Sequence, residues 1–255
     1  MDATETLDNT ARGHAAPVPA RAPRPVPAFA FDAVMGVVLM LAISVAFGIG
    51  WTMASTGAPG TMSLLWMTAL GMGGAALLMY FWRRRSTPAE RAASAQAARR
   101  PSTWGWAALV AGAMFAGTSL LQWLMGQAGI EVEPTNLQLI QDGLALHPVQ
   151  VLVFAALLAP AYEELLFRRV LFGRLWAAGR PWLGMLLSSS VFALMHEFPG
   201  VSGNPIETTI LLWAIYGLMG AAFAWVYWRT GTLWAAFGAH ALHNLASCLV
   251  LLAIA

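Results

Sequence analysis

Seven apolar stretches dominate the sequence, and most are close to the roughly 20 residues that an α-helix needs to cross the hydrocarbon core of a bilayer. They run approximately over residues 30–51, 62–82, 104–126, 149–171, 182–198, 208–228 and 232–254. A chain in lipid must satisfy its backbone hydrogen bonds internally, so each stretch predicts a helix and not an isolated strand. We therefore predict an all-α fold, a polytopic membrane helix bundle of about seven transmembrane helices, with the lipid bilayer as its partner.

The composition excludes several other classes of protein. Hydrophobic residues make up 58% of the chain and charged residues 10%, whereas a soluble domain has nearer a quarter of its residues charged. This balance argues against a soluble domain, a disordered chain and a protein that binds nucleic acid through a basic face. The single cysteine, Cys248, lies in an apolar run and leaves no disulfide framework or cysteine-based metal cluster.

The basic residues, all of them arginine, fall on one side of a seven-helix arrangement. They are Arg12, Arg21, Arg24, Arg83, Arg84, Arg85, Arg91, Arg99, Arg100, Arg168, Arg169, Arg174, Arg180 and Arg229. The loops on the opposite side, 52–61, 127–148 and 199–207, carry acids but no arginine. The positive-inside rule therefore predicts a cytoplasmic N-terminus and a C-terminus on the far side. Together with the Ala-rich composition, this pattern favours a bacterial inner membrane.

Hydropathy and charge divide the chain into three parts. Residues 1–28 are polar and Pro-rich, cannot bury enough apolar surface to offset their ordering entropy, and are expected to form a disordered cytoplasmic tail. They lack the short apolar stretch of a signal peptide. Residues 29–103 should form two N-terminal transmembrane helices and a basic loop. Residues 104–255 hold the intramembrane ionisable residues and should form the functional core.

The fourth stretch places two adjacent carboxylates, Glu163 and Glu164, inside an apolar span. Neighbours on a helix point about 100° apart, so the two acids should have different surroundings. Arg168 lies four residues after Glu164 and can pair with it. That pairing leaves Glu163 without a local cation, which suits a general base, and Pro160 predicts a kink just before the acids. A structural salt bridge with a second acid near the interface is the alternative.

The fifth stretch ends in a histidine, His196, that shares a helix face with Phe192. Alone, such a residue is typical of a polar side chain at the membrane interface. His196 and Glu197 begin like the zinc-protease motif His-Glu-x-x-His, but position 200 is Gly200 and Pro199 ends the helix. We therefore reject a soluble zinc protease.

The seventh stretch contains His240 and Asn244, which lie four residues apart and share a helix face. His243 lies at the edge of that face and is a further polar contact. Polar side chains in lipid need partners, and this pair could serve only to hold neighbouring helices together. His147 and His14 lie outside the apolar stretches and are read as solvated.

Together the three segments supply a carboxylate, two imidazoles and an amide. Such groups can hold and deprotonate a water molecule, with or without a divalent metal, and stabilise an oxyanion. We expect Glu163, His196, His240 and Asn244 to meet in one polar cavity. Counting along the helices puts Glu163 and His240 roughly 12 Å, but His196 roughly 20 Å, from the cytoplasmic ends. The fifth helix must therefore begin further into the cytoplasm or tilt strongly.

The motifs Glu163-Glu164-x-x-x-Arg168, Phe192-x-x-x-His196 and His240-x-x-x-Asn244, in this order, resemble those of the CPBP family, which includes type II CAAX prenyl proteases and bacteriocin-processing, Abi-type proteins. The resemblance covers about residues 104–254. It implies an intramembrane endopeptidase that hydrolyses a peptide bond in a membrane-associated peptide or protein. Glu163 would activate water beside His196, while His240 and Asn244 would hold the water or metal and the oxyanion. Glu164, Arg168 and Phe192 would be supporting residues.

Members of this family are usually called metalloproteases, so a divalent metal such as zinc on Glu163, His196 and His240 is one form of the expected site. The same side chains can activate water directly. Intramembrane Glu and His side chains are also typical of small transporters and proton relays, and a non-catalytic membrane scaffold or immunity protein could keep them for packing. A bacterial source argues against a prenylated substrate.

Overall fold

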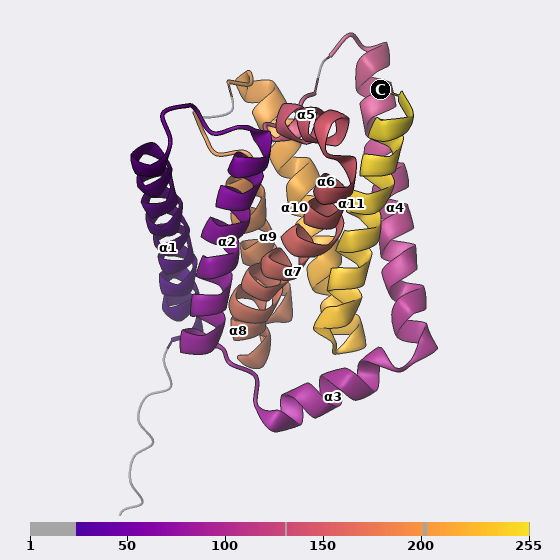
Figure 1. The fold of residues 1–255 in the computed structure, drawn as a ribbon. Helices are drawn as coiled ribbons and strands as arrows, with labels where there is room; N and C mark the ends of the chain where they lie inside the picture. Colours follow the sequence, from indigo (N-terminus) through magenta and orange to yellow (C-terminus); the bar gives the residue numbers. More distant parts are fainter. Residues whose placement is uncertain (1–23, 131, 201–202, 255) are drawn as a thin grey trace, which may run out of the picture.

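A computed structural model describes residues 24–130, 132–200 and 203–254, and within these ranges all regular structure is helical (Figure 1). The elements are α1 (Pro25–Ala54), α2 (Thr61–Arg83), α3 (Pro88–Ala98), α4 (Pro101–Gln127), α5 (Leu137–Leu146), α6 (Pro148–Val153), the π-helical η1 (Phe154–Leu158), α7 (Ala159–Glu163), the π-helical η2 (Glu164–Phe172), α8 (Gly173–Ala177), α9 (Pro181–His196), α10 (Ile206–Thr230) and α11 (Leu233–Ile254). The prediction of an all-α membrane bundle is confirmed.

Six of the helices are long and apolar enough to cross a membrane. They are α1, α2, α4, the continuous helix Pro148–Ala177, α10 and α11. The fifth stretch that we expected to span forms α9, whose 16 residues reach about 24 Å, less than the ~30 Å hydrocarbon core. Figure 1 shows α9 within the bundle, and α1 begins at the end opposite to the C-terminus.

The first helix begins before the expected end of the N-terminal tail. The structure begins α1 at Pro25, so residues 25–28, which we assigned to the tail, are helical. Prolines are tolerated in the first turn of a helix because the N–H groups there have no intrahelical acceptor. Residues 1–23 lie outside the described residues.

The expected basic loop contains a helix, α3. Its start is a capping box: Thr87 Oγ1 accepts from the Glu90 N–H at 3.1 Å, and Glu90 Oε2 accepts from the Thr87 N–H at 2.8 Å. These two bonds satisfy donors that a short helix would otherwise leave open. The helix crosses the Arg-rich end below α4 and α11 (Figure 1), where the Ser94 and Thr232 hydroxyls lie 2.8 Å apart.

A buried acid ties the first two helices to the core. Asp32 lies in the first third of α1 and is 0% exposed. One of its oxygens accepts from Arg83 Nε at 2.7 Å, and the other accepts from Arg174 Nε. A buried carboxylate needs such partners because an unpaired one would be expensive to desolvate. Asp32 therefore links α1, α2 and α8.

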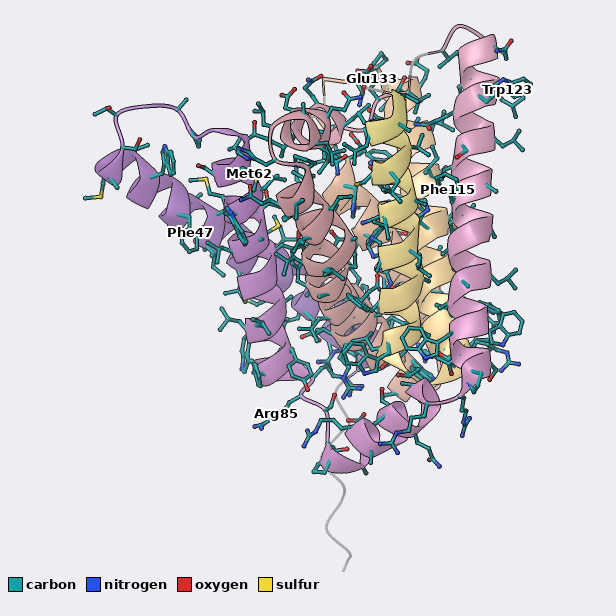
Figure 2. All side chains as sticks on the ribbon, turned by 45° about the vertical axis from the view of Figure 1, so that its right-hand side comes forward. Phe47, Met62, Arg85, Phe115, Trp123 and Glu133 are labelled. Atoms are coloured by element: carbon teal, nitrogen blue, oxygen red, sulfur yellow. The ribbon has the colours of Figure 1, made fainter. Side chains whose placement is uncertain are left out.

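The outer surface and the two ends match a membrane protein. Large apolar side chains such as Phe47 on α1 and Trp123 on α4 face outward (Figure 2). Arg85 lies at the end that carries α3, and Glu133 lies at the opposite end. This separation of basic and acidic ends is the one that the arginine pattern predicts. The choice of the cytoplasmic side stays a prediction.

The close approach of α9 and α10 depends on a glycine. A Cβ at Gly220 would lie 3.0 Å from the Cα atom of Ser189, which is tighter than most Cβ contacts, so the two backbones would have to move apart slightly. Small residues at such crossings let helix backbones approach in lipid. This contact holds α9, and with it His196, against the bundle.

Candidate active site

The helix that carries the acids is irregular just before them. In η1 the Ala159 N–H donates to the carbonyl of Phe154, five residues back. In that register the carbonyl of Ala155 would face Pro160, which has no N–H to donate. Asn244 Nδ2 supplies the missing donor at 2.9 Å. The break expected from Pro160 is therefore present as a π-helical segment, and α11 stabilises it through Asn244.

The two adjacent acids have different partners, as the sequence predicts. Glu164 Oε2 lies 3.0 Å from Arg168 Nε, and both side chains are almost completely buried. Glu164 Oε1 accepts a hydrogen bond from His240 Nδ1 at 2.9 Å. Glu164 is therefore neutralised and also holds a ring from another helix.

Glu163 lies between two imidazoles. Its Oε2 atom is 3.7 Å from His196 Nε2 and 3.8 Å from His240 Nε2. The residue is only 8% exposed, and Oε2 has no hydrogen-bond partner among the described residues. Side chains from α7, α9 and α11 thus converge on one point, as the sequence predicts for these three residues.

The hydrogen-bond partners of His196 and His240 show which nitrogen of each ring carries a hydrogen. His196 Nδ1 lies 2.8 Å from the Phe192 carbonyl, and His240 Nδ1 lies 2.9 Å from the Glu164 carboxylate. A carbonyl or carboxylate oxygen only accepts, so in each ring Nδ1 carries a hydrogen and Nε2 is the nitrogen that faces Glu163. Polar atoms 3.7 and 3.8 Å apart can be bridged by a water molecule.

Aromatic side chains surround this cluster. The ring of Phe223 stacks on His240 with centroids 4.6 Å apart, and Tyr216 lies 4.4 Å from the His196 ring. The Arg168 guanidinium lies 4.6 Å from the Phe192 centroid. These rings exclude bulk water and fix the imidazole planes, so Phe192 has the supporting place that its motif predicts.

The sequence predicted different depths for Glu163 and His196. The structure removes this difference mainly because the helix that carries Glu163 is longer than expected. The helix with Glu163 continues to Ala177, six residues beyond the predicted limit of the fourth stretch. Glu163 lies 14 residues before that end and His196 lies 15 residues after Pro181, so both counts correspond to roughly 20 Å. α11 begins at Leu233, above α3 (Figure 1), and the 3.8 Å between His240 Nε2 and Glu163 Oε2 puts these two side chains at the same depth.

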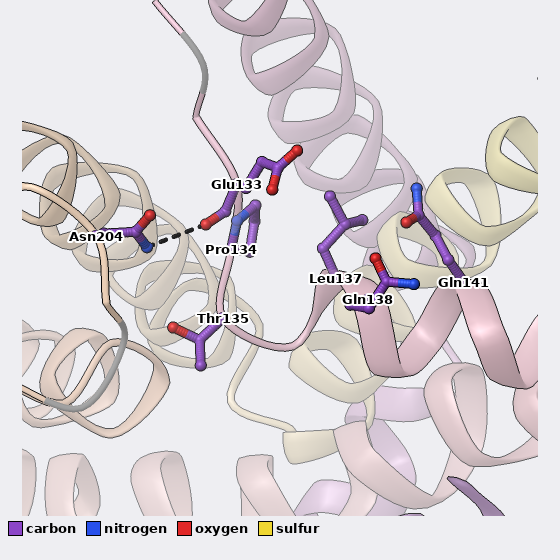
Figure 3. Close-up of a pocket in the computed structure, with 7 residues that line it drawn as sticks. All are labelled: Glu133, Pro134, Thr135, Leu137, Gln138, Gln141 and Asn204. Atoms are coloured by element: carbon purple, nitrogen blue, oxygen red, sulfur yellow. Dashed lines mark hydrogen bonds between the residues drawn. The ribbon is translucent and has the colours of Figure 1, made fainter.

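Asn244 has a partner that the sequence did not predict. Its amide nitrogen donates to the helix backbone, as described above. The single polar cavity expected around the four residues stays a prediction; two hollows in the described part of the chain lie elsewhere. One is polar, about 180 Å³, and lies at the Arg-free end. It is lined by Glu133, Pro134, Thr135, Leu137, Gln138, Gln141 and Asn204 (Figure 3).

The metal form of the site stays a prediction. Within the described residues, no group of three His, Cys, Asp or Glu side chains already stands in a metal-binding arrangement. No step below depends on a metal.

Four residues near the site or its supports were missed or undervalued. Glu197 and Asp32 are buried acids; Glu197 directly follows α9, and Asp32 lies near the start of the first apolar stretch, where a carboxylate looks solvated in sequence. Glu197 directly follows a motif residue, which was a usable signal. Phe223 and Tyr216 carry no such signal, because an aromatic residue in an apolar helix is ordinary.

Comparisons with known proteins address this part of the chain. The sequence model described as type II CAAX prenyl endopeptidase Rce1-like matches residues 145–246. The match contains all the motif positions, from Glu163 to Asn244. Residues 145–246 are thus similar to the Rce1-like CAAX endopeptidases and are called the Rce1-like segment below. The Rce1-like segment begins after α4, so the region 104–144, which we included in the resemblance, lies outside it.

The chain is also similar to a protein from a bacterium. The chain is 31% identical over 116 residues to a Bacillus subtilis (strain 168) protein described as "Putative membrane peptidase YdiL". The aligned region is 46% of this chain and 43% of the relative, so the chain matches less than half the length of that protein. No solved structure matches the chain significantly. The chain is an integral membrane protein with several spans, and its segment 145–246 is similar to CAAX-type membrane endopeptidases.

Proposed function

We propose that this chain is an intramembrane endopeptidase that hydrolyses a peptide bond in a membrane-associated peptide or protein. The observation that supports the proposal most strongly is the approach of Glu163 Oε2 to two imidazole Nε2 atoms, 3.7 and 3.8 Å away, inside a bundle of apolar helices. A buried acid whose Oε2 atom has no hydrogen-bond partner among the described residues is costly in lipid and indicates function.

In the proposed reaction a water molecule occupies the space between Glu163, His196 and His240. Glu163 takes a proton from it, and the oxygen attacks the carbonyl carbon of the scissile peptide. The proton then passes to the leaving nitrogen as the C–N bond breaks, which gives a new carboxylate and a new amine. The neighbouring Nε2 lone pairs orient the water, so the attack begins from a fixed position.

The developing oxyanion needs donors. An amide nitrogen carries two N–H groups, and Asn244 uses one on the Ala155 carbonyl. The second can donate to the oxyanion. His240 can add a donor when it takes a proton, because the Glu164 carboxylate at Nδ1 stabilises the charged ring.

The test is quantitative membrane proteomics on cells that express the wild type, Glu163→Gln or His196→Ala. We expect the same intact membrane polypeptides to accumulate in both variants, with loss of their cleaved fragments. Glu207→Gln, which changes an exposed acid in the first turn of α10, is the matched control and should behave as the wild type. Unchanged processing in both site variants, with normal insertion, would refute the proposal.

A further inference from the structure

Glu197 is a fully buried acid that the proposed reaction does not use. It is 0% exposed and directly follows His196. Its Oε1 atom accepts from the Thr135 N–H at 2.7 Å, and its Oε2 atom accepts from the Thr135 hydroxyl at 2.6 Å. Short bonds of this kind are typical of a charged acceptor. Within the described residues Glu197 forms no ion pair, so Thr135 is its main compensation.

The backbone of Glu197 fixes the end of α9. Its N–H donates to the Ala193 carbonyl at 3.0 Å, and its carbonyl accepts from the Trp213 indole N–H at 2.7 Å. His196 lies in the same last turn, and its ring is oriented by the Phe192 carbonyl. The direction of His196 Nε2 therefore depends on the geometry of a turn that Glu197 holds from two sides.

Thr135 belongs to the segment that leads into α5 at the Arg-free end. The segment is itself anchored, because Asn204 Nδ2 donates to the Glu133 carbonyl at 3.1 Å (Figure 3). Thr135 also lines the polar hollow of that end. The segment over residues 132–136 thus lies between the polar hollow and the helical turn that carries His196, and it contacts both.

We propose that Glu197 is a positioning residue for His196 and that Thr135 is the residue that holds Glu197 in place. Thr135 and Glu197 are called the clamp below. The clamp keeps His196 Nε2 aimed at Glu163 and couples the segment over residues 132–136 to the reaction centre. This inference rests on the proposed hydrolytic function for its consequence, but its geometry can be tested without any substrate.

The test uses diethyl pyrocarbonate, which carbethoxylates imidazole nitrogens, on the full-length protein in detergent, with mass spectrometry to follow His196. Thr135→Val removes the hydroxyl donor with little change in volume. We expect it to open the last turn of α9 and speed modification of His196 roughly threefold or more. Thr135→Ser keeps the hydroxyl and should return the rate to that of the wild type. The exposed His147 provides the internal reference in each sample.

Thr118→Val is the matched control, because the Thr118 hydroxyl bonds only within α4. It should leave the His196 rate unchanged. Modification of His196 at the wild-type rate in both Thr135→Val and Glu197→Gln, with each variant folded, would overturn the clamp. That outcome would leave the proposed hydrolysis standing, because it does not concern Glu163.

Activity gives a second measure that simple loss of stability would not reproduce. For a substrate found in the Glu163→Gln proteomic comparison, Thr135→Val should lower kcat about tenfold with little change in KM, because only the alignment of His196 is altered. Thr135→Ser should restore kcat. A change confined to KM, or failure of Thr135→Ser to restore kcat, would contradict a positioning role.

Discussion

The carboxylate of Glu164 accepts a hydrogen bond from Nδ1 of His240 at 2.9 Å, although the two residues are 76 positions apart in sequence. The same carboxylate lies 3.0 Å from Arg168 Nε. One acid thus neutralises a buried guanidinium and turns the His240 ring so that Nε2 faces Glu163. The second acid of the Glu-Glu pair is the support of the first, which explains why adjacent acids are useful here.

Glu164→Gln should therefore damage both stability and chemistry. The neutral amide leaves Arg168 charged and buried without its counter-ion, and we expect the free energy of unfolding to fall by about 3 kcal/mol. Thermal unfolding in detergent checks this value, with Glu207→Gln as the control. A variant as stable as the wild type would show that Arg168 does not need this partner.

Asn244 stabilises the π-helical segment, and this role can be tested separately from its proposed donation to the oxyanion. Asn244→Leu removes the donor to the Ala155 carbonyl, and we expect a loss of stability of about 1–3 kcal/mol, the cost of an unsatisfied buried acceptor. Unfolding measured with and without Pro160→Ala checks the origin of that loss. The Ala variant restores an N–H, so the cost of Asn244→Leu should shrink on that background. An equal cost on both backgrounds would contradict this account of the π-helical segment.

Asp32 should couple the two N-terminal helices to the Rce1-like segment. Asp32→Asn removes the charge that Arg83 and Arg174 share, so α1 should separate from α8 more often. Disulfide trapping between cysteines introduced on α1 and α8 should then be slower than in the Asp32 parent. Equal trapping rates would show that apolar packing alone holds α1.

The attachment of α3 should depend on acid pH. The hydrogen bond from Arg169, the largest influence, lowers the pKa of Glu90 from 4.5 to about 2. Because the folded-state pKa is below the unfolded one, this contribution is complete above about pH 4.5 and is lost as pH falls toward 2. The effect is modest, since the Glu90 side chain is 44% exposed.

A spin label on α3, at a cysteine that replaces the exposed Ala92, checks this pH dependence by electron paramagnetic resonance. Label mobility should rise below about pH 4. Glu90→Gln should be mobile already at neutral pH and nearly independent of pH. A profile that is the same for both proteins would contradict a role for the Glu90–Arg169 pair.

The fold was predictable from sequence because lipid allows few alternatives. Length and hydropathy indicated the spans, and the spacing of four residues correctly paired Glu164 with Arg168.

The depth of the site residues in the bundle was not predictable, because it depends on where a helix continues beyond its apolar stretch, as the helix that ends at Ala177 does. α3 was missed although its Thr-Pro-Ala-Glu start is readable, since attention to charge alone indicated a loop. The partner of Asn244 depends on a π-helical register that no local pattern showed.

The most direct measurement of the central idea is hydrolysis by the purified chain in liposomes, with a polypeptide that accumulates in the Glu163→Gln cells and water enriched in oxygen-18. The account predicts cleavage by the wild type, with one heavy oxygen in the new C-terminal carboxylate, and none by Glu163→Gln. Cleavage by Glu163→Gln at the rate of the wild type would contradict it.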